Sequence, residues 1–153
     1  MTIAIYAGSF DPFTLGHLDV LKQACSIFEK VIITIGINPD KKSFISLNDR
    51  IEIIKKATDG LNVEVKTCEG LIVDFAKENG ATVLIRGLRN SVDFESERNL
   101  GVNNNKLNPE IKTVYFISSP EYSHISSSAV RELLSYNKDI SHLVPKAVCD
   151  YLL

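Results

Sequence analysis

The stretch IAIYAGSFDPFTLGH, residues 3–17, joins a short apolar run to a glycine-containing turn and then to the start of an amphipathic segment. The apolar run at residues 3–7 predicts a buried strand, and the segment after residue 14 predicts a helix with His17 in its first turn. The first turn of a helix has unpaired N–H groups and a positive dipole end, which favour anions such as phosphate. We therefore expect a nucleotide to bind where this strand ends.

The rest of the chain alternates between apolar, β-branched runs and runs of helical period. Strands are expected at residues 31–37, 63–67, 82–85 and 113–117, and helices at residues 18–28, 46–57, 71–79, 93–105 and 129–134, with a short one after Pro145. The glycine and asparagines within residues 101–105 weaken the fourth of these helices, so its course stays open. The alternation predicts a single doubly wound α/β domain over residues 1–153, with a Rossmann-like parallel sheet covered on both faces.

Four segments far apart in sequence follow the ends of predicted strands, at residues 8–9, 38–42, 86–89 and 118–128. Ligands of parallel α/β sheets bind beyond the carboxyl ends of the strands. We therefore expect the four segments to converge on one edge of the sheet and to form the binding site there.

Two of these segments have residue types suited to phosphate. RGLR, residues 86–89, offers two guanidinium groups for bidentate contacts, although a solvated loop with two cations is the simpler alternative. The serines at residues 126–128 stand before a helix and would supply hydroxyl and N–H donors as a second phosphate cradle. The simpler alternative for them is an ordinary helix cap, which needs one serine.

Composition excludes several classes of protein. The hydrophobic content of 44%, the charged content of 24% and the net charge of −2 are typical of a soluble globular chain. Broad binding to nucleic acid or to an anionic membrane usually needs a basic face, so we expect neither partner. The three cysteines include no C-x-x-C pair, which predicts no zinc site or redox dithiol and favours a reduced, cytoplasmic setting. No apolar run is long enough for a membrane-spanning helix.

The residues TLGH at 14–17 resemble the T-x-G-H or H-x-G-H motif of the nucleotidyltransferase superfamily. Four further segments match in order over essentially the whole chain: GSFDP at 8–12, ATVLIRGLR at 81–89, DFE at 93–95 and YSHISSS at 122–128. Together they resemble the phosphopantetheine adenylyltransferase family, which also has threonine at the position of Thr14. The resemblance implies transfer of AMP from ATP to 4′-phosphopantetheine, which gives dephospho-coenzyme A and pyrophosphate in coenzyme A biosynthesis.

The resemblance also implies roles for individual residues. His17 would be the catalytic residue, through hydrogen bonds to the ATP phosphates, and its protonation state stays open. Residues implied to bind the acceptor are Ser9, Lys41, Ile72 and Arg86. Residues implied to bind ATP are Ser9, Phe10, His17, Gly87, Leu88, Arg89, Glu97, Tyr122, Ser123, His124, Ile125, Ser126, Ser127 and Ser128. The family further implies Mg²⁺ bound with ATP rather than at a metal site of the protein, feedback inhibition by coenzyme A, and a homohexamer.

Two alternatives stay open at this point. The first is another small-molecule nucleotidyltransferase, one that uses CTP or a different phosphorylated acceptor; Thr14 and the RGLR segment argue against it. The second is a sensor of nucleotide or coenzyme A without catalytic activity. The intact set of charged groups argues against a sensor, which has no need of the histidine that contacts the transferred phosphate.

Overall fold

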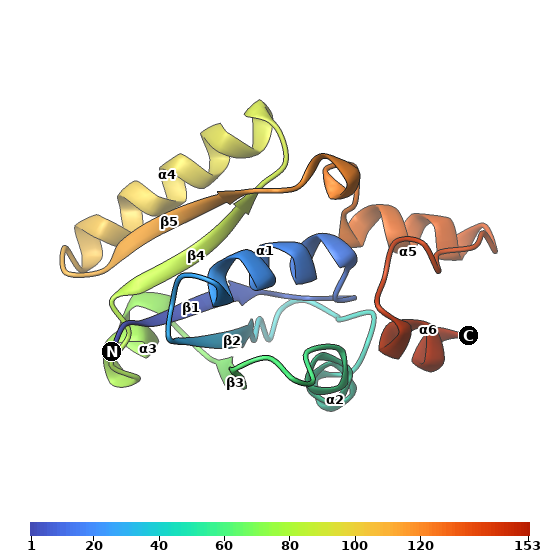
Figure 1. Cartoon of the computed structure of the whole chain (residues 1–153), viewed down its shortest axis with the longest axis horizontal. Helices are drawn as coiled ribbons and strands as arrows, with labels where there is room; N and C mark the ends of the chain where they lie inside the picture. The colour runs from blue at the N-terminus through green and yellow to red at the C-terminus, as the bar shows by residue number, and fades with distance from the viewer.

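The computed structural model describes all residues from Met1 to Leu153 and alternates strands with helices (Figure 1). The strands are β1 (Ile3–Gly8), β2 (Lys30–Gly36), β3 (Val63–Cys68), β4 (Val83–Leu88) and β5 (Lys112–Ile117). The helices are α1 (Leu15–Cys25), α2 (Leu47–Ala57), α3 (Ile72–Glu78), α4 (Ser91–Leu107), α5 (Ser127–Ser135) and α6 (Lys146–Leu152), with a 3₁₀ turn at Pro120–Tyr122. None of these helices combines the length and the hydropathy needed to cross a lipid bilayer.

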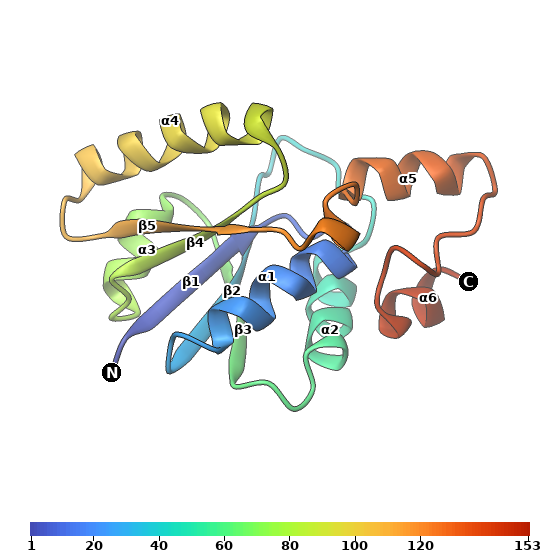
Figure 2. The same cartoon turned by 45° about the horizontal axis from the view of Figure 1, so that its top comes forward.

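The five strands form one parallel sheet in the order β3-β2-β1-β4-β5. The prediction of a doubly wound parallel α/β fold is therefore confirmed. The first strand lies in the middle of the sheet, between β2 and β4, so the direction of winding reverses beside it. This reversal is where open parallel sheets leave a crevice for ligands, at the carboxyl ends of the strands. In Figure 2, β1 and β5 run toward the side of the molecule on which α5 lies, whereas the segment after β4 turns back into α4.

Helices cover both faces of the sheet. Because successive side chains of a strand point to opposite faces, Ile33 and Ile32 of β2 enter two different cores. Ile33 packs in the larger core with residues of α1, α2, α5 and α6, whereas Ile32 packs with Val73 and Ala76 of α3 in the smaller one. Full burial of one such isoleucine contributes about 1.5–3 kcal/mol.

Two predicted boundaries are wrong. The strand expected at residues 82–85 continues as β4 through Leu88, because Arg86, Gly87 and Leu88 pair with residues 115–117 of β5. The segment therefore is not a loop, and only Arg89 follows the strand. The helix expected to reach residue 28 ends at Cys25, and Ile27 lies on the surface with 66% of its area exposed.

Helix α4 is continuous over 17 residues, in spite of its glycine and asparagines. Asn90 caps its first turn by accepting a hydrogen bond from the Asp93 amide. The packing of Gly101 explains its presence, since a Cβ at this position would collide with the hydroxyl oxygen of Tyr115. That hydroxyl donates to the Glu97 carbonyl oxygen at 2.7 Å and joins α4 to β5. The Tyr115 hydroxyl of β5 thus occupies the space that a side chain at position 101 of α4 would need.

Candidate active site

A cavity of about 360 Å³ opens at the carboxyl edge of the sheet, and we call it the cleft. Its walls come from β1 and the loop after it, the start of α1, the end of β4, the inner side of α4 and the start of α5, together with Lys41 from the loop after β2. The predicted convergence of four distant segments on one edge is therefore confirmed. Its lining includes Ser9, Phe10, His17, Lys41, Arg86, Gly87, Arg89, Glu97, Ile125, Ser126, Ser127 and Ser128.

His17 is fixed by the start of its own helix. The Thr14 amide donates to Nδ1 of His17 at 3.0 Å, while the Thr14 hydroxyl accepts from the His17 amide at 3.2 Å. This is a capping box in which histidine stands where glutamate or glutamine is usual. Because Nδ1 accepts a hydrogen bond, its lone pair is occupied and the proton of a neutral ring resides on Nε2. The cleft therefore receives an N–H donor from His17.

The surroundings of the imidazole keep it neutral. Its ring stacks on Phe13 with centroids 5.6 Å apart and meets the edge of Phe10 at 5.0 Å. Burial among these rings, together with the nearby positive charges of Arg89 and Arg86, lowers the pKa of His17 to about 4. The ring is thus an uncharged donor at neutral pH in the absence of ligand.

Arg86 is held by Glu97 from α4. Its Nε and Nη2 donate to the two carboxylate oxygens of Glu97 at 2.6 and 2.7 Å, and Nη1 donates to the Ala7 carbonyl at 3.0 Å. This bidentate pair fixes the plane of the guanidinium. One N–H on each terminal nitrogen is left for an anion, since a guanidinium has five.

Arg89 is held in the same way by Asp93, which lies one turn before Glu97 in α4. Its Nε donates to Asp93 Oδ2 at 3.0 Å, and Nη1 reaches the Ile125 carbonyl at 3.3 Å. Asp93 and Glu97 are four residues apart, so they share the face of α4 that looks toward β4. One helix therefore positions two of the cationic side chains of the cleft, Arg86 and Arg89.

The serine segment offers both backbone amides and hydroxyls to a ligand. Ser126 is the N-cap of α5 and its hydroxyl accepts from the Ala129 amide at 3.1 Å. The Ser127 hydroxyl donates to the Pro12 carbonyl at 2.7 Å, and the Ser128 hydroxyl accepts from Arg131 at 3.3 Å. Only the Ser127 hydroxyl therefore donates within the protein, and the Ser126 and Ser128 hydroxyls accept these bonds and keep their own O–H groups for an anion. The unpaired first-turn amides of α5 and its positive dipole end remain available to an anion.

Some residues implied by the resemblance lie outside the cleft. Leu88, Tyr122, Ser123 and His124 do not line it, and His124 is exposed. Ile72 lines a separate small pocket on the α3 face, next to Arg86 and Leu100. That pocket reaches Ala7 and Arg86, which also line the cleft, so the two spaces adjoin.

Sequence reasoning assigned no role to three residues that shape the cleft. Asp93 and Arg131 line it, and the spacing of each could have indicated its partner. Asp93 follows Arg89 by four residues and pairs with it, and Arg131 follows Ser128 by three residues and donates to its hydroxyl. Val20 of α1 is the third, since a Cβ at Gly87 would lie 2.9 Å from its methyl group. Gly87 thus allows α1 to pack closely on β4, rather than only leaving room for a ligand.

The carboxylates of the cleft fit a role as partners of cations and amides, and not as a metal cage. Glu97 and Asp93 are paired with arginines. Asp11 lies just outside the lining, and both of its oxygens accept from the backbone amides of Phe44 and Ile45 at 2.7 and 2.8 Å. No group of three or more His, Cys, Asp or Glu side chains is arranged to hold a metal ion. A divalent cation in the cleft would therefore take its ligands from a bound nucleotide and water.

Comparisons with known proteins agree with this geometry. The family model described as cytidylyltransferase-like matches residues 5–133. A protein of Nautilia profundicola named phosphopantetheine adenylyltransferase is 48% identical over 148 residues, which cover 96% of each chain. One of the same name from Helicobacter hepaticus is 46% identical over 152 residues, covering 99% of this chain and 92% of the relative. A crystal structure of a putative nicotinate-nucleotide adenylyltransferase from Vibrio parahaemolyticus matches with a TM-score of 0.72 at 18% identity, covering 99% of this chain and 92% of that one, and supports the fold alone.

Proposed function

Because this chain belongs to the phosphopantetheine adenylyltransferases of the cytidylyltransferase-like family, we propose that it transfers AMP from ATP to 4′-phosphopantetheine. The products are dephospho-coenzyme A and pyrophosphate. The observation that carries the proposal is the meeting in one cleft of the His17 donor, two guanidinium groups and the first turns of two helices.

The reaction needs aligned substrates and stabilisation of the charge on the leaving group, and it needs no protein nucleophile. An oxygen of the acceptor phosphate attacks the α-phosphorus of ATP and forms the new P–O bond. The bond between the α-phosphorus and the bridging oxygen of the β-phosphate breaks, and its electron pair leaves with pyrophosphate. The attacking group is already an anion, so no side chain has to remove a proton. Catalysis then consists of aligning two polyanions and stabilising the charge that moves to the leaving group.

On the ATP side, Nε2–H of His17 donates to a phosphate oxygen as charge develops there, and Arg89 and the first turn of α5 bind the neighbouring phosphates. Mg²⁺ would bind through the phosphate oxygens of ATP, because the carboxylates of Glu97 and Asp93 are paired with arginines. Its chemistry is to neutralise part of the triphosphate charge. His17 is neutral in the ligand-free protein, so its contribution in this proposal is a directed hydrogen bond rather than a charge.

On the acceptor side, Arg86, Lys41 and Ser9 bind the phosphate of 4′-phosphopantetheine. Its pantetheine arm extends toward the small pocket lined by Ile72 and Leu100, which is mostly apolar. Coenzyme A contains the same arm, and we propose that it inhibits the enzyme by occupying this pocket. The pairing of Arg86 with Glu97 keeps the guanidinium in place before the acceptor arrives.

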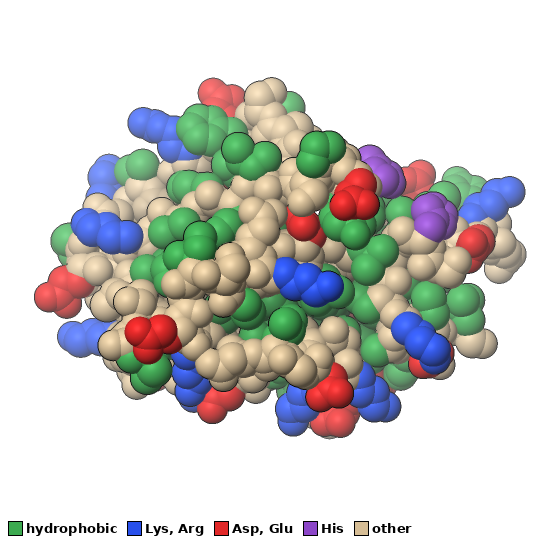
Figure 3. Space-filling model, in the orientation of Figure 1, with side chains coloured by type: hydrophobic (Ala, Val, Ile, Leu, Met, Phe, Trp, Pro, Cys, Tyr) green, Lys and Arg blue, Asp and Glu red, His purple; other side chains and the backbone are tan.

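We also propose that the chain assembles into a homohexamer, as the resemblance implies. The support in this protomer is α4, which has no buried residue and leaves Val92, Phe94, Val102 and Leu107 between 41% and 79% exposed. Figure 3 shows hydrophobic side chains at the surface in this region of the molecule. Apolar side chains gathered on one helix indicate an interface.

The direct test is to incubate the protein with ATP, Mg²⁺ and 4′-phosphopantetheine and to measure dephospho-coenzyme A by mass spectrometry. A parallel reaction with CTP tests the alternative nucleotide. Product with ATP but not with CTP supports the proposal. Tight binding of coenzyme A together with no exchange between ATP and labelled pyrophosphate would instead identify a sensor.

A further inference from the structure

The turn at residues 9–13, which joins β1 to α1, has a strained backbone beside the cleft. Phe10 has a φ of 48°, in the left-handed region that a bulky side chain rarely adopts. Such a conformation is costly and persists only where the surrounding structure fixes it. The Phe10 ring packs inward against the His17 ring, with centroids 5.0 Å apart, and Phe10 is buried. The strain therefore lies next to the side chain that donates to phosphate in the proposed mechanism.

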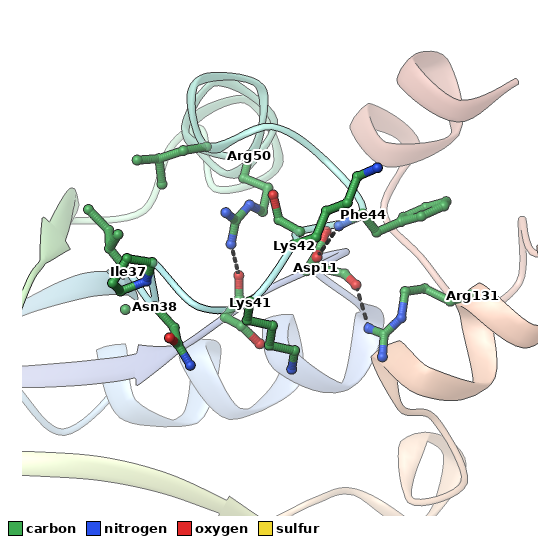
Figure 4. Close-up of a pocket in the computed structure, with 13 residues that line it drawn as sticks. Asp11, Ile37, Asn38, Lys41, Lys42, Phe44, Arg50 and Arg131 are labelled. Atoms are coloured by element: carbon green, nitrogen blue, oxygen red, sulfur yellow. Dashed lines mark hydrogen bonds between the residues drawn. The ribbon is translucent and has the colours of Figure 1, made fainter.

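Side chains from two helices hold this turn by its carbonyl groups. Arg50 Nη1 donates to the Ser9 carbonyl at 2.8 Å, and Arg131 Nη1 donates to the Asp11 carbonyl at 2.7 Å. The Ser127 hydroxyl donates to a third carbonyl of the turn at 2.7 Å. Figure 4 shows Arg50 reaching the turn from α2 and Arg131 reaching it from α5. The bond from Arg50 is the one adjacent to the strained residue.

Arg50 has no other interaction that accounts for a charged side chain at its position. The residue is 8% exposed and has no carboxylate within salt-bridge distance. Its Nε is buried without a hydrogen-bond partner, which is costly for a guanidinium N–H. It lines the cavity of about 670 Å³ between β2 and α2, and not the cleft. The hydrogen bond to the Ser9 carbonyl is the one polar contact of its side chain.

That hydrogen bond fixes the plane of the peptide between Ser9 and Phe10. The peptide is trans, so it is planar and its C=O and N–H lie on opposite edges. Because Arg50 draws the Ser9 carbonyl toward α2, the Phe10 N–H points away from α2. This amide donates to no group of the protein, and both residues of the peptide line the cleft. A free backbone N–H close to the His17 ring is a second directed donor for a phosphate oxygen.

We propose that Arg50 is a positioning residue for the transfer step. It holds the Ser9–Phe10 peptide so that the Phe10 amide donates to an oxygen of the transferred phosphate, beside the donor of His17. Arg50 touches no substrate in this role and acts through the turn. When its hydrogen bond is lost, the peptide can rotate toward a relaxed backbone and the amide loses its direction. The inference rests on the proposed function for the identity of the phosphate.

The first test observes the Phe10 amide directly by NMR. The protein is labelled with ¹⁵N in its seven phenylalanines only, and the Phe10 signal is identified by its absence in Phe10→Leu. On titration with Mg²⁺ and an ATP analogue with a methylene between the α- and β-phosphorus, the amide proton of Phe10 should move downfield in the wild type. Arg50→Met removes the donors to the Ser9 carbonyl and should lose most of this shift.

The matched control is Ile53→Val, which removes one methyl-sized group from the buried side of the same helix. Ile53 is buried in the larger core and lines neither the cleft nor the neighbouring cavity. The substitution lowers stability without touching the turn. It should keep the wild-type shift of the Phe10 amide.

The second test separates kcat from KM. Arg50→Met should lower kcat about tenfold, less than removal of a whole donor would, and should change both KM values less than about threefold, because the transferred phosphate gains charge in the transition state. Arg50→Lys retains one donor on a flexible stem, so it should restore most of kcat and lose only about threefold. Ile53→Val should have the kcat of the wild type. Circular dichroism checks the fold of each variant, and if Arg50→Met does not fold, Arg50→Lys decides by the same two measurements.

Three results would overturn the role of Arg50. One is a wild-type shift of the Phe10 amide in Arg50→Met. Another is a tenfold rise in the KM for 4′-phosphopantetheine with an unchanged kcat, which would indicate direct contact with the acceptor. The last is an equal loss of kcat in Ile53→Val, which would indicate a general effect of stability. The NMR titration does not depend on turnover, so a wild type that forms no dephospho-coenzyme A would refute the proposed function and leave the shift to decide on Arg50.

Discussion

Replacing Gly101 by alanine should destabilise the protein, although alanine is the better helix former. In an unrestrained helix the change would add about 1 kcal/mol of stability. Here the new Cβ collides with the Tyr115 hydroxyl oxygen and lies 3.4 Å from Tyr115 Cζ. Overpacking of this kind costs about 1–3 kcal/mol, and displacement of the hydroxyl also removes its hydrogen bond to Glu97, worth about 1 kcal/mol. We expect a net loss of about 1–3 kcal/mol.

The sign of the effect should reverse when the hydroxyl is removed. In a Tyr115→Phe background the remaining contact at 3.4 Å is an ordinary van der Waals distance, so Gly101→Ala should then add about 1 kcal/mol. The assay is urea unfolding of the four proteins of this double-mutant cycle at one protein concentration, with a coupling of about 2 kcal/mol or more expected. If Gly101→Ala stabilises the protein in both backgrounds, the packing account of this glycine is wrong.

Three further predictions concern the cleft. His17→Ala should lower turnover about 100- to 1000-fold, measured as pyrophosphate release, with an unchanged circular dichroism spectrum, because it removes one donor to the transferred phosphate; turnover within threefold of wild type would remove His17 from the mechanism. Glu97→Gln should raise the KM for 4′-phosphopantetheine about tenfold and leave the KM for ATP nearly unchanged, since it loosens Arg86; an equal rise in both constants would contradict the assignment of Arg86 to the acceptor. The pKa of His17 is lowered to about 4 in the folded state, so between pH 6.5 and 4 the unfolded chain binds more protons than the folded one. The free energy of unfolding should therefore fall as the pH falls, by up to about 1.4 kcal/mol per pH unit. In urea unfolding over the same pH range, His17→Gln should show a shallower decline of this free energy, and parallel curves for the two proteins would disprove the shift.

Much of the architecture follows from local pattern. The runs of apolar residues and the helical periods between them predicted every strand of the sheet and its parallel, doubly wound arrangement, because both faces of such a sheet are buried. They did not predict the order of the strands. The convergence of residues 8–9, 38–42, 86–89 and 118–128 on one edge then followed from topology.

Features that depend on contacts between distant segments were not predictable in this way. The residues Arg86 and Gly87 at the start of the RGLR segment resemble a loop, yet residues 86–88 extend β4 because β5 pairs with them. The continuity of α4 depends on the fit of Gly101 to Tyr115, which no single-segment pattern contains. Arg50 resembles an ordinary surface residue of an amphipathic helix, and only the approach of the loop after β1 buries it and gives it the Ser9 carbonyl as partner.

The two sides of helix α4 make different contacts. Its inner side bears the two carboxylates that orient the arginines, and its outer side bears apolar groups without a covering in the protomer. A continuous helix moves as a rod, so a neighbouring subunit that pressed on the outer side would also shift the carboxylates beneath it. Affinity for both substrates would then vary with assembly, and dilution below the dissociation constant of the assembly would weaken catalysis even where each protomer stayed folded.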